Sequence, residues 1–142
     1  MTAARSEARL SIIIPAKNEA AIIGDVVASV REHYAKAEIL VVNDGSDDDT
    51  ASVAEKSGAT DGTHPVSLGN GAAIKSGARA AKGDIFVMMD GDGQHKAADI
   101  RSLIEKLDAG YDMAIGARDS GSHAGVGRLA ANGLYNVFAS MI

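Results

Sequence analysis

Apolar residues fall into short blocks separated by longer stretches of helical character, a pattern that predicts strands alternating with helices. Runs of consecutive apolar, largely β-branched residues predict buried strands at 10–15, 38–42, 85–89 and 113–117, with a short further strand within 59–68. The intervening segments predict helices at 19–34, 50–57, 70–82, 97–109 and 128–142. This alternation favours an α/β fold, with a mostly parallel sheet covered by helices on both faces.

The residues that follow each predicted strand carry most of the candidate chemistry. Right-handed crossovers place all strand-to-helix loops at one edge of a parallel sheet, and open α/β sheets bind ligands at that edge. Four such segments are rich in polar and charged residues: PAKNE (15–19), NDGSDDDT (43–50), DGDGQH (90–95) and GAR (116–118). The pattern therefore predicts one active site built from four separate loops.

Two aspartates, Asp90 and Asp92, directly follow the strand at 85–89, with Gly91 between them. Like charges this close indicate that a cation lies beside them, and the glycine leaves room for a ligand to approach the backbone. Carboxylate oxygens suit Mg²⁺ or Mn²⁺, and Mg²⁺ is commonly held by one or two carboxylates together with substrate phosphates. Gln94 can supply a further oxygen. The alternative is an ordinary Asp-Gly surface turn.

Other charged residues near the strand ends have both a functional and a structural interpretation. Asp44 follows the second strand, where its carboxylate can accept hydrogen bonds from a ribose or a base. The aspartates at 47–49 are better explained as residues that favour the start of a helix than as ligands. Glu19 is either a site residue or a helix cap, and Arg118 is either a diphosphate ligand or an exposed surface arginine.

The glycine-rich segment GNGAAIKSG (69–77) lacks the lysine and serine placement of a Walker loop and the third glycine of a dinucleotide fingerprint. Its glycines are interpreted as the place where the start of a helix approaches the sheet closely. No nucleophile elbow and no Ser/His/Asp arrangement is visible in the sequence. The pattern favours neither a nucleotide-phosphate loop nor a serine hydrolase.

Length and composition restrict the remaining possibilities. The 142 residues suit one domain over 10–142, with 1–9 as a tail. A net charge of −5 argues against sequence-independent binding of nucleic acid. The chain has no cysteine, which excludes disulfides and thiolate zinc sites. No segment approaches the roughly 18 apolar residues of a membrane span, so a cytoplasmic protein without a transmembrane segment is expected.

Taken together, four segments of this sequence resemble the family 2 glycosyltransferases of the GT-A fold, in family order and spacing. They are SIIIPAKNEA, EILVVNDGSDDDT, GNGAAIKSGARAAKGDIFVMMDGDGQH and AIGAR, and they cover about residues 10–118. The chain is most similar to the polyprenyl-phosphate sugar transferases, the branch that resembles dolichol-phosphate mannosyltransferase. The resemblance implies a Rossmann-like GT-A domain. Because relatives continue beyond the position of Ile142, the chain is interpreted either as truncated at its C-terminus or as a reduced member of the family.

The resemblance implies a nucleotide-sugar donor, either a UDP-sugar or a GDP-sugar. Residues from the first two loops would then form the nucleoside site: Pro15, Lys17 and Glu19 would line the pocket, with Val42 and Asp44 at the base and ribose. Lys17 stands where relatives often have an aromatic residue that stacks on the base.

The third loop would hold the diphosphate and the metal ion. Asp90, Gly91 and Asp92 match the Asp-x-Asp motif of the family, Gln94 would support the Mg²⁺ or Mn²⁺ ion, and Arg118 would contact phosphate. Asp92 and Arg118 are the expected catalytic residues, since both would stabilise the negative charge of the departing diphosphate.

The resemblance also implies transfer with inversion of the anomeric centre. A sugar hydroxyl acceptor needs a carboxylate base, but residues 120–142 contain no Asp or Glu. A lipid phosphate is already anionic, so a polyprenyl phosphate is the expected acceptor unless a base lies in a missing C-terminal part. The alternatives are a non-catalytic nucleotide-sugar-binding module and a sugar nucleotidyltransferase.

The final segment, LAANGLYNVFASMI (129–142), is apolar along one side if it is helical. Three explanations remain open: packing into the core, association with the cytoplasmic face of a membrane beside a lipid acceptor, or pairing with a second copy in a homodimer.

Overall fold

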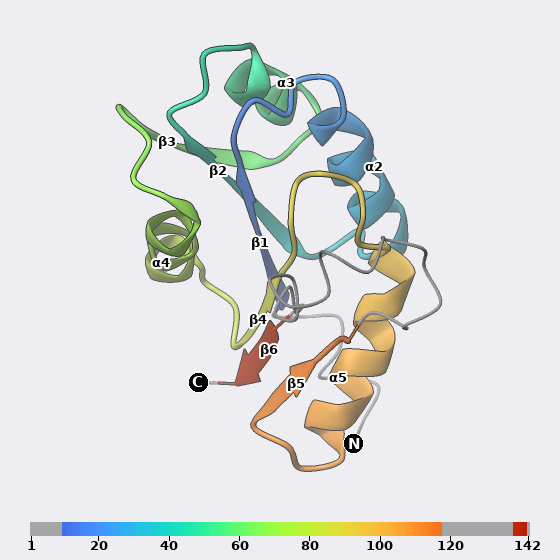
Figure 1. Ribbon diagram of the computed structural model, residues 1–142. Helices are drawn as coiled ribbons and strands as arrows, with labels where there is room; N and C mark the ends of the chain where they lie inside the picture. The colour runs from blue at the N-terminus through green and yellow to red at the C-terminus, as the bar shows by residue number, and fades with distance from the viewer. Residues whose placement is uncertain (1–9, 118–137, 142) are drawn as a thin grey trace, which may run out of the picture.

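The computed structural model describes residues 10–117 and the backbone of 138–141. These residues form a six-stranded sheet with helices on both faces (Figure 1). The strands are β1 (Leu10–Ala16), β2 (Glu38–Asp44), β3 (Thr60–His64), β4 (Ile85–Met88), β5 (Met113–Ile115) and β6 (Phe138–Met141). The helices are α2 (Ile23–His33), α3 (Thr50–Lys56), α4 (Asn70–Ala80), the 3₁₀ turn η1 (Ala97–Asp99) and α5 (Ile100–Asp108).

The sheet has the order β3-β2-β1-β4-β6-β5. The four strands β3, β2, β1 and β4 are parallel, whereas β6 pairs antiparallel with both β4 and β5. The expected mostly parallel α/β architecture is therefore confirmed. The carboxyl ends of β1, β2 and β4 lie at one edge, where the loops to α2, α3 and η1 begin.

The consecutive isoleucines of β1 are all buried because both faces of the sheet are covered. Ile12 and Ile14 belong to the larger core, which α2 and α5 close on one face. Ile13 points to the other face and packs with Leu40 and Phe86 beside α4. In Figure 1, α4 accordingly lies on the opposite side of the sheet from α2 and α5. A strand covered on both faces favours apolar residues on both faces, and Ser11, which is also buried, is the exception in β1.

The glycine that lets α4 approach the sheet is Gly77, near the middle of the helix. A Cβ atom at this position would lie 2.4 Å from Cγ2 of Ile13. The expectation that the start of the helix makes the close approach was wrong, since a Cβ at Gly69 or Gly71 would have nothing within 4 Å. Gly69 instead has a φ of 93°, which suits the turn into the helix.

The predicted helix at 128–142 is wrong at its end, since residues 138–141 form strand β6. Phe138 stands opposite both Met88 of β4 and Ile115 of β5 in the two registers. Pairing with two distant strands overrides the local helical pattern. The rest of that predicted helix lies outside the described residues.

None of the helices in the described part of the chain combines the length and the apolarity needed to cross a membrane.

Candidate active site

The Asp90–Asp92 loop lies directly against the end of β1. A Cβ atom added to Gly91 would stand 3.2 Å from the carbonyl oxygen of Pro15 and 3.3 Å from Cβ of Ala16. Only a residue without a side chain fits this contact without displacing its neighbours. Asp90 and Asp92 flank the buried glycine and are both half-buried. The backbone that carries both aspartates therefore lies against the end of β1, so the loops after β1 and β4 are neighbours.

The loops after β1 and β2 are joined to each other by four hydrogen bonds. Each bond links a residue of 18–20 with a residue of 46–50, so the two loops form one unit at the edge of the sheet. The bonds run from the Asn18 amide to Ser46 Oγ (2.9 Å), from the Asp47 amide to Asn18 Oδ1 (2.9 Å), from the Glu19 amide to Thr50 Oγ1 (2.9 Å) and from the Ala20 amide to Asp48 Oδ2 (3.1 Å).

Asp48 organises the start of α3 as well as this junction. Its carboxylate accepts a hydrogen bond from the Thr50 amide (3.0 Å) and another from the Thr50 hydroxyl. Asp49 occupies the N-cap position, but its side chain makes no capping hydrogen bond. The prediction that the aspartates at 47–49 serve the start of a helix holds for Asp48, which also holds the β1 loop through Ala20.

Carboxylates from three loops interact around Glu19. Burial raises the pKa of Glu19, and the negative charges of Asp92, Asp48 and Asp90 raise it further, in that order. These four side chains come from the loops after β1, β2 and β4, so three of the four loops that were predicted to converge do so. A cation placed among them would remove the repulsion that opposes ionisation of Glu19.

The Asp-Gly-Asp loop suits a metal ion that is held partly by substrate. Within 10–117 and 138–141, no three His, Cys, Asp or Glu side chains are arranged to hold a metal ion unaided. Two carboxylates and an amide oxygen leave most positions of a Mg²⁺ or Mn²⁺ ion to phosphate oxygens and water, which is the common arrangement for Mg²⁺ with phosphate substrates. The residues therefore fit a metal–diphosphate complex.

The backbone of this loop is held in place from within. Asp92 Oδ1 accepts a hydrogen bond from the Gln94 amide (2.9 Å), across Gly93 with its φ of 75°. The Asp90 amide donates to His95 Nδ1 (3.3 Å), and His95 Nε2 lies 3.8 Å from Asp90 Oδ2. Sequence reasoning missed His95; its spacing of five residues from Asp90 was the available signal.

Asp44 is buried at the end of β2, and its carboxylate is surrounded by protein donors. It accepts hydrogen bonds from His64 Nδ1, Ser67 Oγ and the amides of Leu68 and Gly69, each 2.8 Å long. The bond from His64, followed by that from the Leu68 amide, holds the pKa of the Asp44 carboxyl well below its ordinary range. Sequence analysis predicted the position of Asp44 but not these partners.

His64 also contacts Ser76 of α4, with 2.9 Å between His64 Nε2 and Ser76 Oγ. The fold thus brings together a Ser76–His64–Asp44 chain that was not visible in the sequence. Its members come from α4, β3 and β2, and only the pairing of β2 with β3 places His64 opposite Asp44. Residue spacing alone could not have indicated it.

The remaining predicted site residues differ in their accessibility. Pro15 and Val42 are partners in neighbouring strands and are both buried. Val42 Cγ2 lies toward α4, 3.2 Å from the place of a Cβ at Gly77, so its side chain contributes to packing. Lys17 is exposed beside the β1 loop. Arg118 lies outside the described residues.

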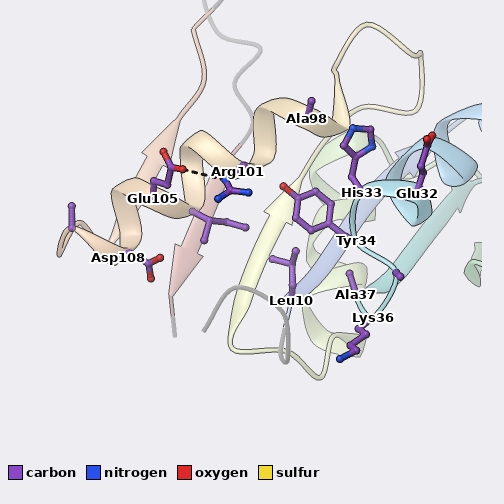
Figure 2. Close-up of a pocket in the computed structure, with 13 residues that line it drawn as sticks. Leu10, Glu32, His33, Tyr34, Lys36, Ala37, Ala98, Arg101, Glu105 and Asp108 are labelled. Atoms are coloured by element: carbon purple, nitrogen blue, oxygen red, sulfur yellow. Dashed lines mark hydrogen bonds and ion pairs between the residues drawn. The ribbon is translucent and has the colours of Figure 1, made fainter. Parts of the chain in front are cut away.

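A groove of about 1030 Å³ opens at the other end of the sheet (Figure 2). Leu10, the first residue of β1, lines it together with residues from the end of α2 and from α5. In Figure 2 the Tyr34 hydroxyl and the Arg101 guanidinium point toward one another across it. Burial raises the pKa of Tyr34, and the charge of Arg101 partly opposes this effect. This groove is separate from the carboxylate cluster.

Comparison with known proteins gives a family and several relatives. Residues 11–133 match Glycosyl transferase family 2. An uncharacterized protein of Methanocaldococcus jannaschii is 37% identical over 111 residues, which are 75% of this chain and 45% of that protein. An undecaprenyl-phosphate 4-deoxy-4-formamido-L-arabinose transferase of Klebsiella pneumoniae is 30% identical over 118 residues, 74% of this chain and 35% of that protein.

A solved structure shares both the fold and part of the sequence. The glucosyl-3-phosphoglycerate synthase of Mycobacterium tuberculosis, in complex with Mn²⁺, UDP and glucosyl-3-phosphoglycerate, superposes with a TM-score of 0.68 at 30% identity. The match covers 80% of this chain and 44% of that protein. The chain spans less than half the length of these relatives. Because the family match extends over most of its residues, this chain belongs to glycosyl transferase family 2.

Proposed function

We propose that this domain binds a UDP-sugar or GDP-sugar with Mg²⁺ or Mn²⁺ and transfers the sugar, with inversion, to a polyprenyl phosphate. The observation that carries the proposal is the meeting of Glu19, Asp48, Asp90 and Asp92 at one edge of the sheet. Burial raises the pKa of Glu19 there, and the charges of Asp92, Asp48 and Asp90 raise it further. So much negative charge calls for a cation, and a divalent cation in turn binds a diphosphate.

The nucleoside is assigned to the loops after β1 and β2, and the diphosphate to the Asp90–Asp92 loop. Pro15, Lys17 and Glu19 line the nucleoside side of the site, and Asp90 and Asp92 hold the metal ion with the support of the Gln94 side chain. The solved relative that binds Mn²⁺ and UDP supports this assignment. The bound ion supplies positive charge to the leaving diphosphate, and Arg118 is assigned to phosphate from the sequence alone.

A lipid phosphate is the proposed acceptor because it needs no base. An anionic phosphate oxygen can attack the anomeric carbon without losing a proton, whereas a sugar hydroxyl must be deprotonated. The undecaprenyl-phosphate transferase among the relatives supports this choice. The proposed location is the cytoplasmic face of a membrane, where such an acceptor is accessible, and a homodimer remains part of the proposal.

Calorimetry with UDP and GDP, each with and without Mn²⁺, tests the donor site. We expect one nucleotide to bind only with Mn²⁺, and Asp92→Asn to weaken that binding by roughly 100-fold, since even the loss of a residue that supports a metal ligand costs about 10–100-fold. Asp112→Asn is the matched control, because Asp112 is exposed in the turn before β5.

A transfer assay with a labelled sugar tests the acceptor. Turnover on a short polyprenyl phosphate, exceeding that on a free sugar, is the expected result. Metal-dependent nucleotide binding without turnover would favour the alternative of a nucleotide-sugar-binding module. Release of pyrophosphate from a nucleoside triphosphate and a sugar phosphate would instead identify a nucleotidyltransferase.

A further inference from the structure

The outer side of α4 carries positive charge. Lys75 and Arg79 are four residues apart, so they lie on one face of the helix, and Lys82 follows just beyond its end. All three residues are exposed. Ala73 and Gly77 are buried against the sheet on the opposite side of the same helix. The cations therefore point away from the protein.

Acidic residues are absent from this part of the sequence. Residues 62–83 contain neither Asp nor Glu, although the whole chain has a net charge of −5. Among the α-helices that the structure describes, α4 alone has no acidic residue. No ion pair within 10–117 involves Lys75, Arg79 or Lys82. These positive charges are thus free to meet a negatively charged partner.

The outer side of α4 is also uncovered. In Figure 1, α4 lies on the opposite side of the sheet from α2 and α5, and its outer side faces away from every other labelled element. Its main contacts are with β1, β2 and β3, all of them on its inner side. Within the part of the chain that the structure describes, a large partner can therefore approach this helix along its length.

Two exposed apolar side chains lie next to the start of α4. Val66 is 61% exposed and Leu68 is 59% exposed. Both belong to the loop at 65–69, which joins β3 to α4. Apolar side chains beside a basic helix face suit the surface of an anionic bilayer, where the apolar groups enter the lipid and the cations contact headgroups. A polyanion in solution would use the cations alone.

We propose that this α4 surface, made of Lys75, Arg79, Lys82 and the loop at 65–69, docks on an anionic lipid bilayer. Its charge is complementary to anionic headgroups, and its apolar residues can enter the lipid. The acidic loops around Glu19 would be repelled by such a bilayer. The protein therefore meets the membrane along α4 and not with the acidic edge of the sheet.

This orientation would bring a lipid acceptor close to the proposed donor site. α4 begins at the carboxyl end of the sheet, because it follows β3, which runs parallel to β2. The loop at 65–69 therefore lies at the same end of the sheet as the loops that carry Glu19 and Asp92. A lipid phosphate in the bilayer can reach that end. This step rests on the proposed function, whereas the docking itself does not.

Co-sedimentation with vesicles tests the docking in the intact chain. We expect binding to vesicles of phosphatidylcholine and phosphatidylglycerol in equal parts, weaker binding as salt is added, and none to phosphatidylcholine alone. A cation near an anionic surface strengthens binding about fivefold, so Lys75→Gln combined with Arg79→Gln should weaken it by roughly 25-fold. The matched control combines Lys56→Gln with Lys106→Gln, which changes the net charge equally at exposed positions of α3 and α5.

Equal losses in the two double variants would overturn the inference, since binding would then depend on net charge and not on α4. Failure of the wild-type chain to bind the mixed vesicles would overturn it too. Val66→Ser separates a bilayer from a polyanion: it should weaken vesicle binding by roughly fivefold and leave binding to polyphosphate unchanged. Polyphosphate binding as tight as vesicle binding, with no effect of Val66→Ser on either, would overturn the choice of a bilayer.

A transfer assay separates the docking from the proposed function. The Lys75→Gln and Arg79→Gln double variant should bind UDP or GDP with Mn²⁺ as the wild type does. It should transfer sugar more slowly only when the polyprenyl phosphate is held in anionic vesicles and not when it is in detergent. Equal rates in vesicles would overturn the proposed orientation. If the wild type binds neither nucleotide, the proposed function fails, and the vesicle comparison still decides the docking.

Discussion

Gly91 shows how one missing side chain positions two carboxylates. A Cβ atom at this position would lie 3.2 Å from the carbonyl oxygen of Pro15. Because glycine has no Cβ, the Asp90–Asp92 loop can pack directly against β1. From the sequence, Gly91 was expected to let a ligand approach the backbone closely. The structure shows that the close approach is to the protein's own backbone.

Gly91→Val should therefore push the Asp90–Asp92 loop away from β1. Overpacking of this kind costs about 1–3 kcal/mol, and Mn²⁺-dependent nucleotide binding should weaken by roughly tenfold. Calorimetry measures the change. Gly62→Val serves as the control, because a Cβ at Gly62, in edge strand β3, meets nothing within 4 Å. Equal affinities in the two variants would show that the contact with β1 is unimportant.

Asp44 should make the stability of the protein depend on pH. Its pKa is lowered in the folded state by hydrogen bonds from His64 and the Leu68 amide. The stabilisation is therefore complete above the ordinary pKa of about 4 and is lost as the pH falls toward the lowered value. Urea unfolding at pH about 7 should show Asp44→Asn to be less stable by about 3 kcal/mol, with a smaller difference at pH about 3. A difference that grows on acidification would contradict this assignment.

At the residue scale, the sequence predicted some of the side chains that meet and missed others. Asp90, Asp92 and Glu19 gather because each follows a strand of one parallel sheet, and that follows from the hydrophobic pattern. The partners of Asp44 could not be predicted, since His64 and Ser76 reach it only through strand pairing and helix packing. The assignment of metal and nucleotide contacts to these residues remains a prediction.

At the scale of elements, α4 is the helix whose packing depends most visibly on a single position. A Cβ at Gly77 would lie 2.4 Å from Ile13 Cγ2 and 3.2 Å from Val42 Cγ2, both side chains of the sheet. The helix cannot move away freely, because Ser76 is bound to His64 on β3. Close helix–sheet contact and the histidine link therefore act on the same turn of α4.

Gly77→Ala should destabilise the protein by about 1–3 kcal/mol through overpacking against Ile13. Gly71→Ala, in the first turn of the same helix, has open space and should be neutral or stabilising by up to about 1 kcal/mol. Thermal unfolding of the two variants makes the comparison. Equal losses of stability would indicate that helix propensity, and not contact with the sheet, controls this helix.

Most elements were predictable because their signals are local. The isoleucines of β1 and the apolar face of α2 identify themselves by spacing alone, and the ends of α3 and α5 are marked by Gly58 and Gly110, both with positive φ. Strand β6 was missed for the opposite reason. Its four residues form a strand because they pair with β4 and β5, which are distant in the sequence. The local sequence of the segment does not indicate these partners.

At the scale of the whole molecule, the two ends of the sheet differ in chemistry. The carboxyl end gathers the acidic loops around Glu19, whereas the amino end opens into the groove between α2 and α5 beside Leu10 (Figure 2). The acidic end is where the rule for open α/β sheets places a ligand. A search for a binding site by cavity size alone would have selected the groove at the amino end of the sheet.

Metal and nucleotide together should stabilise the whole domain. A ligand at 100 times its Kd adds about 2.7 kcal/mol to the free energy of unfolding, which raises Tm by several degrees. We expect this rise with Mn²⁺ and the preferred nucleotide, a smaller change with either alone, and its loss on addition of EDTA. A rise that persists in EDTA would show that the nucleotide binds without the metal ion.

Strand order along the chain differs from strand order in space, and this constrains how the sheet can assemble. β6 lies between β4 and β5, although the ribosome makes it after both. β5 joins the sheet only by pairing with β6. During synthesis, β5 therefore cannot join the sheet until β6 has been made. Until its late neighbour arrives, β4 presents an open edge on which a foreign strand could pair.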